Sequence, residues 1–142
     1  MKLTNRTVTT LFGLAAAATA LTGLTAPTAS ATTTQVTAGC YGPSCNGQDP
    51  VDMGCNTDAY TVGWTDSAKG KIELRYSSSC RANWARISGT SVGQEFWVQN
   101  TNGNIHGWSA TGSTSFGNMV DGSVEARACI ETEDQPICTG WH

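Results

Sequence analysis

Residues 89–93 read Gly-Thr-Ser-Val-Gly, the Gly-x-Ser-x-Gly pattern that surrounds the nucleophilic serine of many hydrolases. In those enzymes a strand precedes the serine and a helix follows it, which exposes the hydroxyl near an oxyanion hole. Here the following residues, 94–100, are typical of a strand, and the chain is short for an α/β hydrolase. We therefore interpret the segment as a turn and Ser91 as a non-catalytic residue.

A general base near neutral pH is most naturally a histidine, and the chain has only His106 and His142. His106 lies close to an Asn-Gly pair, a position typical of a solvated hairpin residue. Glycoside hydrolysis needs two carboxyl groups on either side of a sugar-sized cleft. The neighbouring acids of this chain lie on predicted turns, where solvation explains them more simply: Asp49 with Asp52, and Glu131 with Glu133. We predict that the protein is not an enzyme, with a small extracellular hydrolase as the least favoured alternative.

Two kinds of metal site can be weighed against the sequence. Asp49, Asp52 and Asp58 lie in one loop and suggest calcium, which takes several oxygen ligands, but acids that cap local turns explain this spacing better. Zinc is disfavoured because no two cysteines are separated by two residues and histidines are scarce. We predict no metal and no cofactor.

Six cysteines occur in the chain, three of them within residues 40–58. An even number in an exported protein predicts disulfides, and six cysteines allow fifteen pairings among which sequence alone cannot choose. We predict that nearest neighbours pair: Cys40 with Cys45, Cys55 with Cys80, and Cys129 with Cys138.

The first 31 residues have the layout of a secretory signal peptide. Lys2 and Arg6 precede an apolar run at 11–24, and residues 29–31, Ala-Ser-Ala, form a small-residue cleavage site. The apolar run is too short and too broken to span a bilayer. We therefore expect residues 32–142 to be one domain that is secreted to the extracellular space without a membrane anchor.

Charge excludes one class of partner. Residues 32–142 contain six Lys and Arg against eleven Asp and Glu, so their net charge is −5. Nucleic-acid binding requires a basic face for phosphate contacts. We expect no nucleic-acid partner.

Short alternating segments predict an all-β fold. Within 72–76, Ile72, Leu74 and Tyr76 alternate with charged residues, and Asn102-Gly103 predicts a hairpin that pairs 94–100 with 105–110. Further strands are expected near 60–64, 82–88, 124–130 and 137–140. About seven short strands at this spacing favour a small antiparallel barrel or sandwich.

Several blocks in the same order resemble the YjfA-like family of small secreted bacterial domains of unknown function. They comprise two cysteines separated by four residues, then 46–50 (Asn-Gly-Gln-Asp-Pro), Gly54-Cys55, Asp58-Ala59, 73–77 (Glu-Leu-Arg-Tyr-Ser), Cys80 and 83–86 (Asn-Trp-Ala-Arg). The similarity extends over nearly all of 32–142. It implies an exported, disulfide-containing, sheet-rich domain, and it assigns no site residue.

Tryptophans give the best indication of a binding site. Burial accounts for Trp64 and for Trp84, whereas alternation with Phe96 and Val98 places Trp97 on the opposite face of its strand. The same rule separates Trp108 from Ile105. We therefore predict a binding surface on one sheet face, unless a covering loop buries both tryptophans; its residues are Trp97, Trp108 and His106, with Trp84 and Arg86 as further members.

Two classes of function follow from these expectations. The favoured one is a monomeric, extracellular, protein-binding module, an adaptor or an enzyme inhibitor, because interface cores favour Trp, Tyr and Arg. The alternative is a carbohydrate or cell-wall binding module that stacks sugars on tryptophan.

Overall fold

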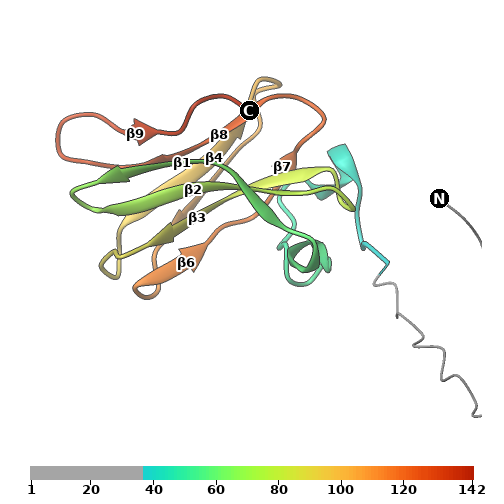
Figure 1. Cartoon of the computed structure of the whole chain (residues 1–142), viewed down its shortest axis with the longest axis horizontal. Helices are drawn as coiled ribbons and strands as arrows, with labels where there is room; N and C mark the ends of the chain where they lie inside the picture. Colours follow the sequence, from blue (N-terminus) through green and yellow to red (C-terminus); the bar gives the residue numbers. More distant parts are fainter. Residues whose placement is uncertain (1–36) are drawn as a thin grey trace, which may run out of the picture. The chain divides into compact units, whose positions relative to one another are not determined.

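The computed structural model describes residues 37–142, and the predicted signal peptide 1–31 lies outside them. The described residues form two antiparallel sheets that face each other without closing into a barrel (Figure 1). The prediction of an all-β fold is therefore confirmed, in its sandwich form. Within this part of the chain, no helix has the length and apolarity needed to cross a membrane.

The first sheet, which we call sheet A, consists of β1 (Tyr60–Ser67), β2 (Gly70–Ser77), β3 (Ala82–Ser88), β6 (Thr114–Phe116) and β7 (Val120–Asp121). The second, sheet B, consists of β5 (Ile105–Ser109), β4 (Glu95–Asn100), β8 (Ala126–Ile130) and β9 (Ile137–Cys138), in this order. Two short 3-10 helices, η1 (Gly42–Cys45) and η2 (Cys55–Thr57), precede β1.

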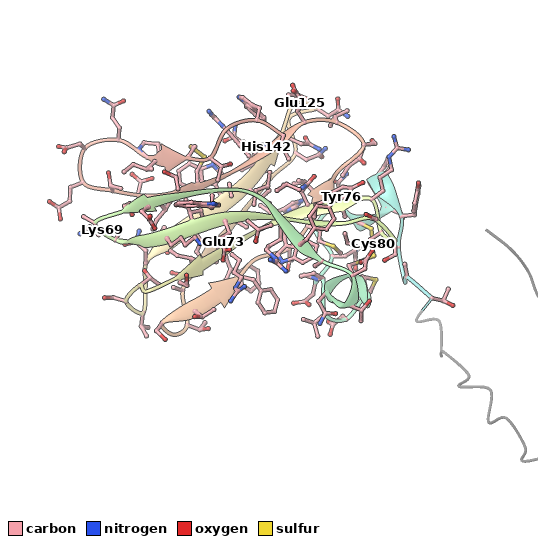
Figure 2. All side chains as sticks on the ribbon, viewed as in Figure 1. Lys69, Glu73, Tyr76, Cys80, Glu125 and His142 are labelled. Carbon is pink, nitrogen blue, oxygen red and sulfur yellow. A yellow bond between two sulfur atoms is a disulfide. The ribbon has the colours of Figure 1, made fainter. Side chains whose placement is uncertain are left out.

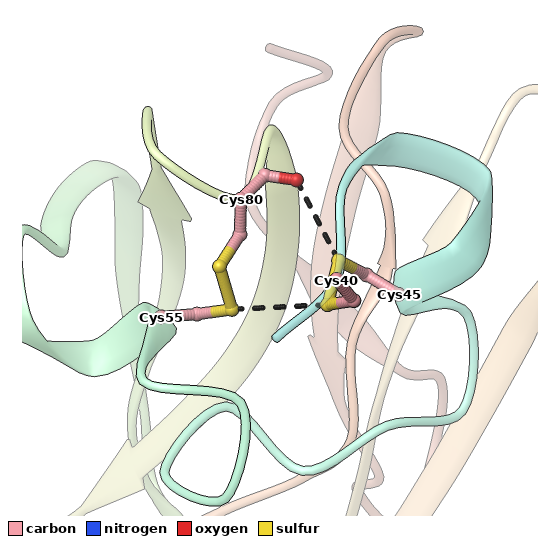
Figure 3. A group of neighbouring side chains, drawn as sticks. All are labelled: Cys40, Cys45, Cys55 and Cys80. Carbon is pink, nitrogen blue, oxygen red and sulfur yellow. Dashed lines mark hydrogen bonds between the residues drawn. A yellow bond between two sulfur atoms is a disulfide. The ribbon is translucent and has the colours of Figure 1, made fainter. Parts of the chain in front are cut away.

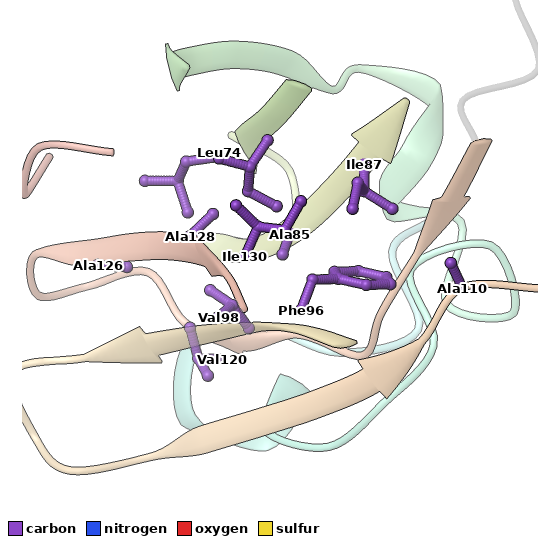
Figure 4. Close-up of a cluster of buried hydrophobic side chains, with 11 residues drawn as sticks. Leu74, Ala85, Ile87, Phe96, Val98, Ala110, Val120, Ala126, Ala128 and Ile130 are labelled. Atoms are coloured by element: carbon purple, nitrogen blue, oxygen red, sulfur yellow. The ribbon is translucent and has the colours of Figure 1, made fainter. Parts of the chain in front are cut away.

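Alternation in β2 and β4 supplies the core between the sheets. Ile72 and Leu74 point inward from β2, while Phe96 and Val98 point inward from β4 and meet them (Figure 4). Each such side chain contributes about 1.5 to 3 kcal/mol when it leaves water. The predicted hairpin is also confirmed: β4 pairs with β5, and Gly103 adopts the left-handed φ of +84° that the turn needs.

The cysteine-rich segment before β1 packs on the outer face of sheet A. Two disulfides lie side by side there, Cys40–Cys45 within the segment and Cys55–Cys80 between it and the β2–β3 turn (Figure 3). Together with Trp84 and Met119 they form a second, smaller core. The third, Cys129–Cys138, joins β8 to β9. All six cysteines are paired as nearest neighbours, as predicted.

A β-bulge near the start of β1 reverses the expected orientation of Trp64. Thr61 pairs with Arg75, but the next paired residue is Gly63, so Val62 is an extra residue. One extra residue moves every later side chain to the opposite face. Trp64 therefore lies on the outer face and is 58% exposed, so the prediction that it is buried in the core was wrong.

Candidate functional site

The structure separates the two tryptophans that were predicted to share a surface. In the β4–β5 hairpin Phe96 pairs with Trp108, whereas Trp97 pairs with Gly107. Cross-strand partners lie on the same face of a sheet, so Trp108 is on the inner face with Phe96 and Trp97 is on the outer face of sheet B. The prediction that Trp97 and Trp108 share a surface is therefore wrong. Alternation along each strand does not tell which residues of the two strands pair with each other.

Each of these residues has a different local environment. Trp97 is half-buried beside its pair partner Cys129, and its Nε1 donates a hydrogen bond to Gln99 Oε1 at 2.9 Å. Trp108 is 42% exposed at the β5 edge, where it packs against Gly117. His106 also belongs to the inner face, and its ring lies where a side chain at Gly47 in the cysteine-rich segment would extend.

Trp84 and Arg86, by contrast, lie together on the outer face of sheet A. Residues from four strands share this face, which we call the aromatic face: Trp64, Lys71, Glu73, Arg75, Trp84, Arg86 and Phe116. The cysteine-rich segment covers one end of it, which leaves Trp84 only 4% exposed. The other end is uncovered and presents Trp64, as well as Phe116, which is 38% exposed.

Cross-strand pairing aligns four of these residues in one row. Pairing runs across β1, β2, β3 and β6 through Trp64, Glu73, Arg86 and Phe116. Strands in a sheet are about 4.8 Å apart, so the two aromatic residues are separated by about 14 Å along the row. An acid and a base therefore stand between two exposed aromatic side chains.

Glu73 organises the charges in this row, midway along β2 (Figure 2). Its side chain is 12% exposed and accepts a hydrogen bond from Thr61 Oγ1 at 3.0 Å. Arg86 Nη1 lies 3.7 Å and Lys71 Nζ 3.9 Å from its carboxylate oxygens. Lys71 also lies over the Trp64 ring, 4.6 Å from the ring centroid.

Arg75 is the best-fixed cation of the face. Its Nη1 donates to Thr61 Oγ1 at 2.7 Å and its Nη2 donates to the Ala59 carbonyl at 2.8 Å. None of the described residues accepts a hydrogen bond from Arg86, so its guanidinium keeps its donors for other partners. The face thus combines one anchored and one available arginine.

A pocket opens where the aromatic face meets the cysteine-rich segment. It measures about 160 Å³, and its walls are Pro50, Val51, Asn56 and Ala59 on one side and Arg75, Trp84, Arg86 and Phe116 on the other. Small-molecule sites typically measure about 300 to 1,000 Å³. This pocket is smaller, and it suits one anchoring side chain of a larger partner.

A larger hollow, of about 350 Å³, lies between the β1–β2 turn and the β8–β9 loop. Its walls comprise the apolar Ile137 together with short and charged residues, among which Lys69 and Glu133 form an ion pair at 2.9 Å. The lysine lowers the pKa of the Glu133 carboxyl by hydrogen bonding and by its charge. The hollow has no aromatic anchor, so size alone does not make it the better site.

Of the three acids that were weighed as calcium ligands, Asp49 and Asp58 accept hydrogen bonds from turns, as we favoured, whereas the exposed Asp52 carboxylate accepts none from a described residue. Asp49 Oδ1 accepts from the backbone N–H of Val51 at 2.7 Å. Asp58 accepts from the Ser77 hydroxyl at 2.6 Å and from the Ser79 backbone N–H at 2.7 Å. Ser91 likewise lies in an exposed turn that leads into β4, so the strand–serine–helix geometry of a hydrolase is absent there.

Sequence reasoning missed Trp64, Glu73, Arg75 and Phe116 as members of the site. The bulge that exposes Trp64 has no marker in the sequence, and β6, which carries Phe116, lies outside the strands that were expected from the sequence. Half of the basic residues in 32–142, namely Lys71, Arg75 and Arg86, gather on the face. The alternation of these basic residues with apolar residues along β2 and β3 was the signal in the sequence that could have revealed the face.

Comparison with known proteins places the chain in a family without identifying a relative of known role. Neither the curated proteins nor the solved structures contain a match to it. A family model described as "Protein of unknown function (DUF2690)" matches residues 43–129, which include all but the first residue of η1, all of η2 and all but the end of the sandwich. The chain therefore belongs to the DUF2690 family.

Proposed function

We propose that the protein is a secreted, non-catalytic binding module whose aromatic face binds another protein outside the cell, as an adaptor or an inhibitor. The observation that carries this proposal is the convergence of Trp64, Phe116 and Arg86 around an uncovered part of sheet A. Tryptophan, tyrosine and arginine dominate the binding energy of protein interfaces.

Pocket size and charge favour a protein partner of particular chemistry. A pocket of about 160 Å³ accepts one apolar side chain of the partner. The face carries Lys71, Arg75 and Arg86 against Glu73 and Asp66, on a domain that is acidic elsewhere. Charge complementarity between partners therefore favours a segment that bears a carboxylate next to an apolar anchor.

Rigidity supports the same proposal. Disulfides hold the cysteine-rich segment against sheet A, and hydrogen bonds fix Arg75. A surface that is already ordered loses less entropy on binding. Disulfides are also typical of proteins from oxidising compartments, which fits export after removal of residues 1–31. We also propose that the chain is related to the YjfA-like family, which its sequence blocks resemble.

The test is capture of partners from culture supernatant by the immobilised protein, followed by affinity measurement. The variant Trp64→Ala/Arg86→Ala should weaken the captured complex by about 30-fold or more, the equivalent of about 2 kcal/mol at a hot spot. Ile105→Ala is the matched control, because Ile105 is an equally exposed apolar residue on sheet B. If the double variant and the Ile105→Ala control retain the captured partner equally well, the partner binds to another surface.

Carbohydrate binding is the second candidate, favoured by the exposed ring of Trp64 and its place in one row with Phe116. Sedimentation with insoluble cell-wall polysaccharide distinguishes the two. A sugar ligand should carry the protein into the pellet in a manner that Trp64→Ala abolishes, whereas a protein partner should leave it in the supernatant.

A further inference from the structure

We propose that the cysteine cluster of the second core has an alternative, reduced state in which its four thiolates bind one Zn²⁺. The cluster consists of Cys40, Cys45, Cys55 and Cys80, whose sulfur atoms all lie within 4.8 Å of one another (Figure 3). All four residues are buried. This inference is independent of the proposed binding function.

The positions of the sulfur atoms match a tetrathiolate site. In tetrahedral zinc sites the Zn–S distance is about 2.3 Å, so neighbouring sulfurs are about 3.8 Å apart. Cys40 Sγ and Cys55 Sγ belong to different disulfides, yet they are 3.9 Å apart. Once both disulfides are open, the remaining sulfurs need only small side-chain rotations to reach the same spacing.

Backbone hydrogen bonds hold the cysteine-bearing segments independently of the disulfides. The Gly42 N–H donates to the Cys80 carbonyl at 2.8 Å, which joins η1 to the turn between β2 and β3. The Cys55 N–H donates to the Pro50 carbonyl at 2.8 Å, and the Cys80 N–H donates to Ser77 Oγ at 3.1 Å. Trp84 and Met119 pack against the cluster and exclude water. These contacts therefore favour the same arrangement of the four ligands when zinc holds the reduced chain folded.

Reduction of the two disulfides and binding of zinc are two separate steps. Each disulfide takes two electrons and two protons from one dithiol reductant, which itself becomes a disulfide, so two reductant molecules convert the pair into four thiols. Zn²⁺ then displaces four thiol protons to solvent and is not itself reduced or oxidised. Export to an oxidising compartment favours the disulfides, and a reducing compartment with available zinc favours the metal.

The third disulfide gives an internal control. Cys129 and Cys138 join neighbouring strands of sheet B and do not belong to the cluster. The variant Cys129→Ser/Cys138→Ser thus retains only the four proposed ligands. Adding Cys80→Ser to it leaves three of them.

Zinc binding is measured on the purified protein and on the four-thiol variant, both reduced anaerobically with a phosphine, which becomes phosphine oxide as it opens each disulfide. Both should retain about one zinc per chain after gel filtration, and circular dichroism should show β structure with zinc and its loss with chelator. Replacing Zn²⁺ by Co²⁺ should give the intense visible bands and sulfur-to-metal charge transfer of a tetrahedral tetrathiolate. Removing Cys80 should weaken them.

Three outcomes would overturn the proposal: no retained zinc, a cobalt spectrum of a six-coordinate oxygen-ligated ion, or zinc affinity that is unchanged in denaturing urea. The last would mean that the thiols bind metal without help from the fold. Partner capture by the oxidised protein is unaffected by any of these outcomes, so the two proposals fail separately.

Discussion

Asp58 links the cysteine-rich segment to the turn that carries Cys80. Burial alone would raise the pKa of its carboxyl, but hydrogen bonds from Ser77 and Ser79 outweigh burial and hold the pKa below its usual value. A carboxyl with a lowered pKa in the folded state stabilises the fold above its unfolded pKa, and it loses that contribution as the pH falls through the folded one.

We expect Asp58→Asn to lower the free energy of unfolding by about 1 to 2 kcal/mol at pH 7, since it removes charge-assisted hydrogen bonds. The difference from wild type should shrink as the pH falls below about 4, where the carboxyl of the unfolded chain takes up its proton, and should be lost below the lowered pKa of the folded carboxyl. Urea denaturation across this pH range measures it. Asp52→Asn is the control, because that exposed carboxylate accepts no hydrogen bond from a described residue; an equal pH effect in both variants would refute the role of Asp58.

Ser91 and His106 allow a second test at the level of single side chains. Ser91 is exposed in the loop before β4 and His106 lies near Gly47, and no described residue forms a hydrogen bond with either side chain. Screening of the wild type against ester, peptide and glycan substrates should detect no turnover that Ser91→Ala or His106→Ala removes. Hydrolysis that depends on either residue would make the protein an enzyme.

Strand alternation was sufficient to predict the elements but not all of their faces. In β2 and β4 the alternation is unbroken, and Ile72, Leu74, Phe96 and Val98 lie in the core as the pattern predicts. In β1 a single extra residue, Val62, reverses the face of Trp64. In the β4–β5 hairpin the turn sequence predicts that the strands pair, but the register decides which residues share a face.

Substitution of Trp64 and Trp84 tests the orientation of the strands that carry them, because the two residues come from β1 and β3 and lie on the same face. Trp84→Ala should cost about 3 to 5 kcal/mol, as for a buried tryptophan, since it opens a cavity beneath the cysteine-rich segment. Trp64→Ala should cost less than about 1 kcal/mol because its ring is largely in solvent. Chemical denaturation measures the loss of unfolding free energy in both variants. Equal losses would contradict the outward orientation of Trp64 that the bulge produces.

At the scale of the whole molecule, the nearest-neighbour pairing of the cysteines is confirmed, although it was one choice among fifteen. The all-β class and the β4–β5 hairpin followed from local patterns. The packing of residues 40–59 on the outer face of sheet A did not, because that segment has no periodicity that indicates which face it covers. The aromatic face depends on this packing, since the segment buries Trp84 and forms one wall of the pocket. The candidate site is thus a tertiary feature that alternation within single strands cannot reveal.

Cross-linking should dominate the stability of so small a domain. The three disulfides close loops with sequence separations of 5, 25 and 9 residues. Loop-closure entropy assigns these about 2, 3.5 and 2.6 kcal/mol, together about 8 kcal/mol, against a typical net stability of about 5 to 15 kcal/mol. Thiol titration of the unfolded, unreduced protein should find no free thiol, and full reduction in the presence of a metal chelator should unfold the chain.

We also predict the order in which the three disulfides contribute to the stability of the fold. Replacing both cysteines of one disulfide by alanine should destabilise the protein most for Cys55 with Cys80, whose bond ties η2 to the β2–β3 turn across the longest loop. The change at Cys40 with Cys45 should cost least, because Gly42 of η1 keeps its hydrogen bond to the Cys80 carbonyl and Gly47, just after η1, keeps its hydrogen bond to the Met119 carbonyl. Guanidinium denaturation of the three double variants without reductant gives the order directly. If the Cys40–Cys45 variant were the least stable, side-chain packing in the second core rather than loop closure would set the contribution of each bond.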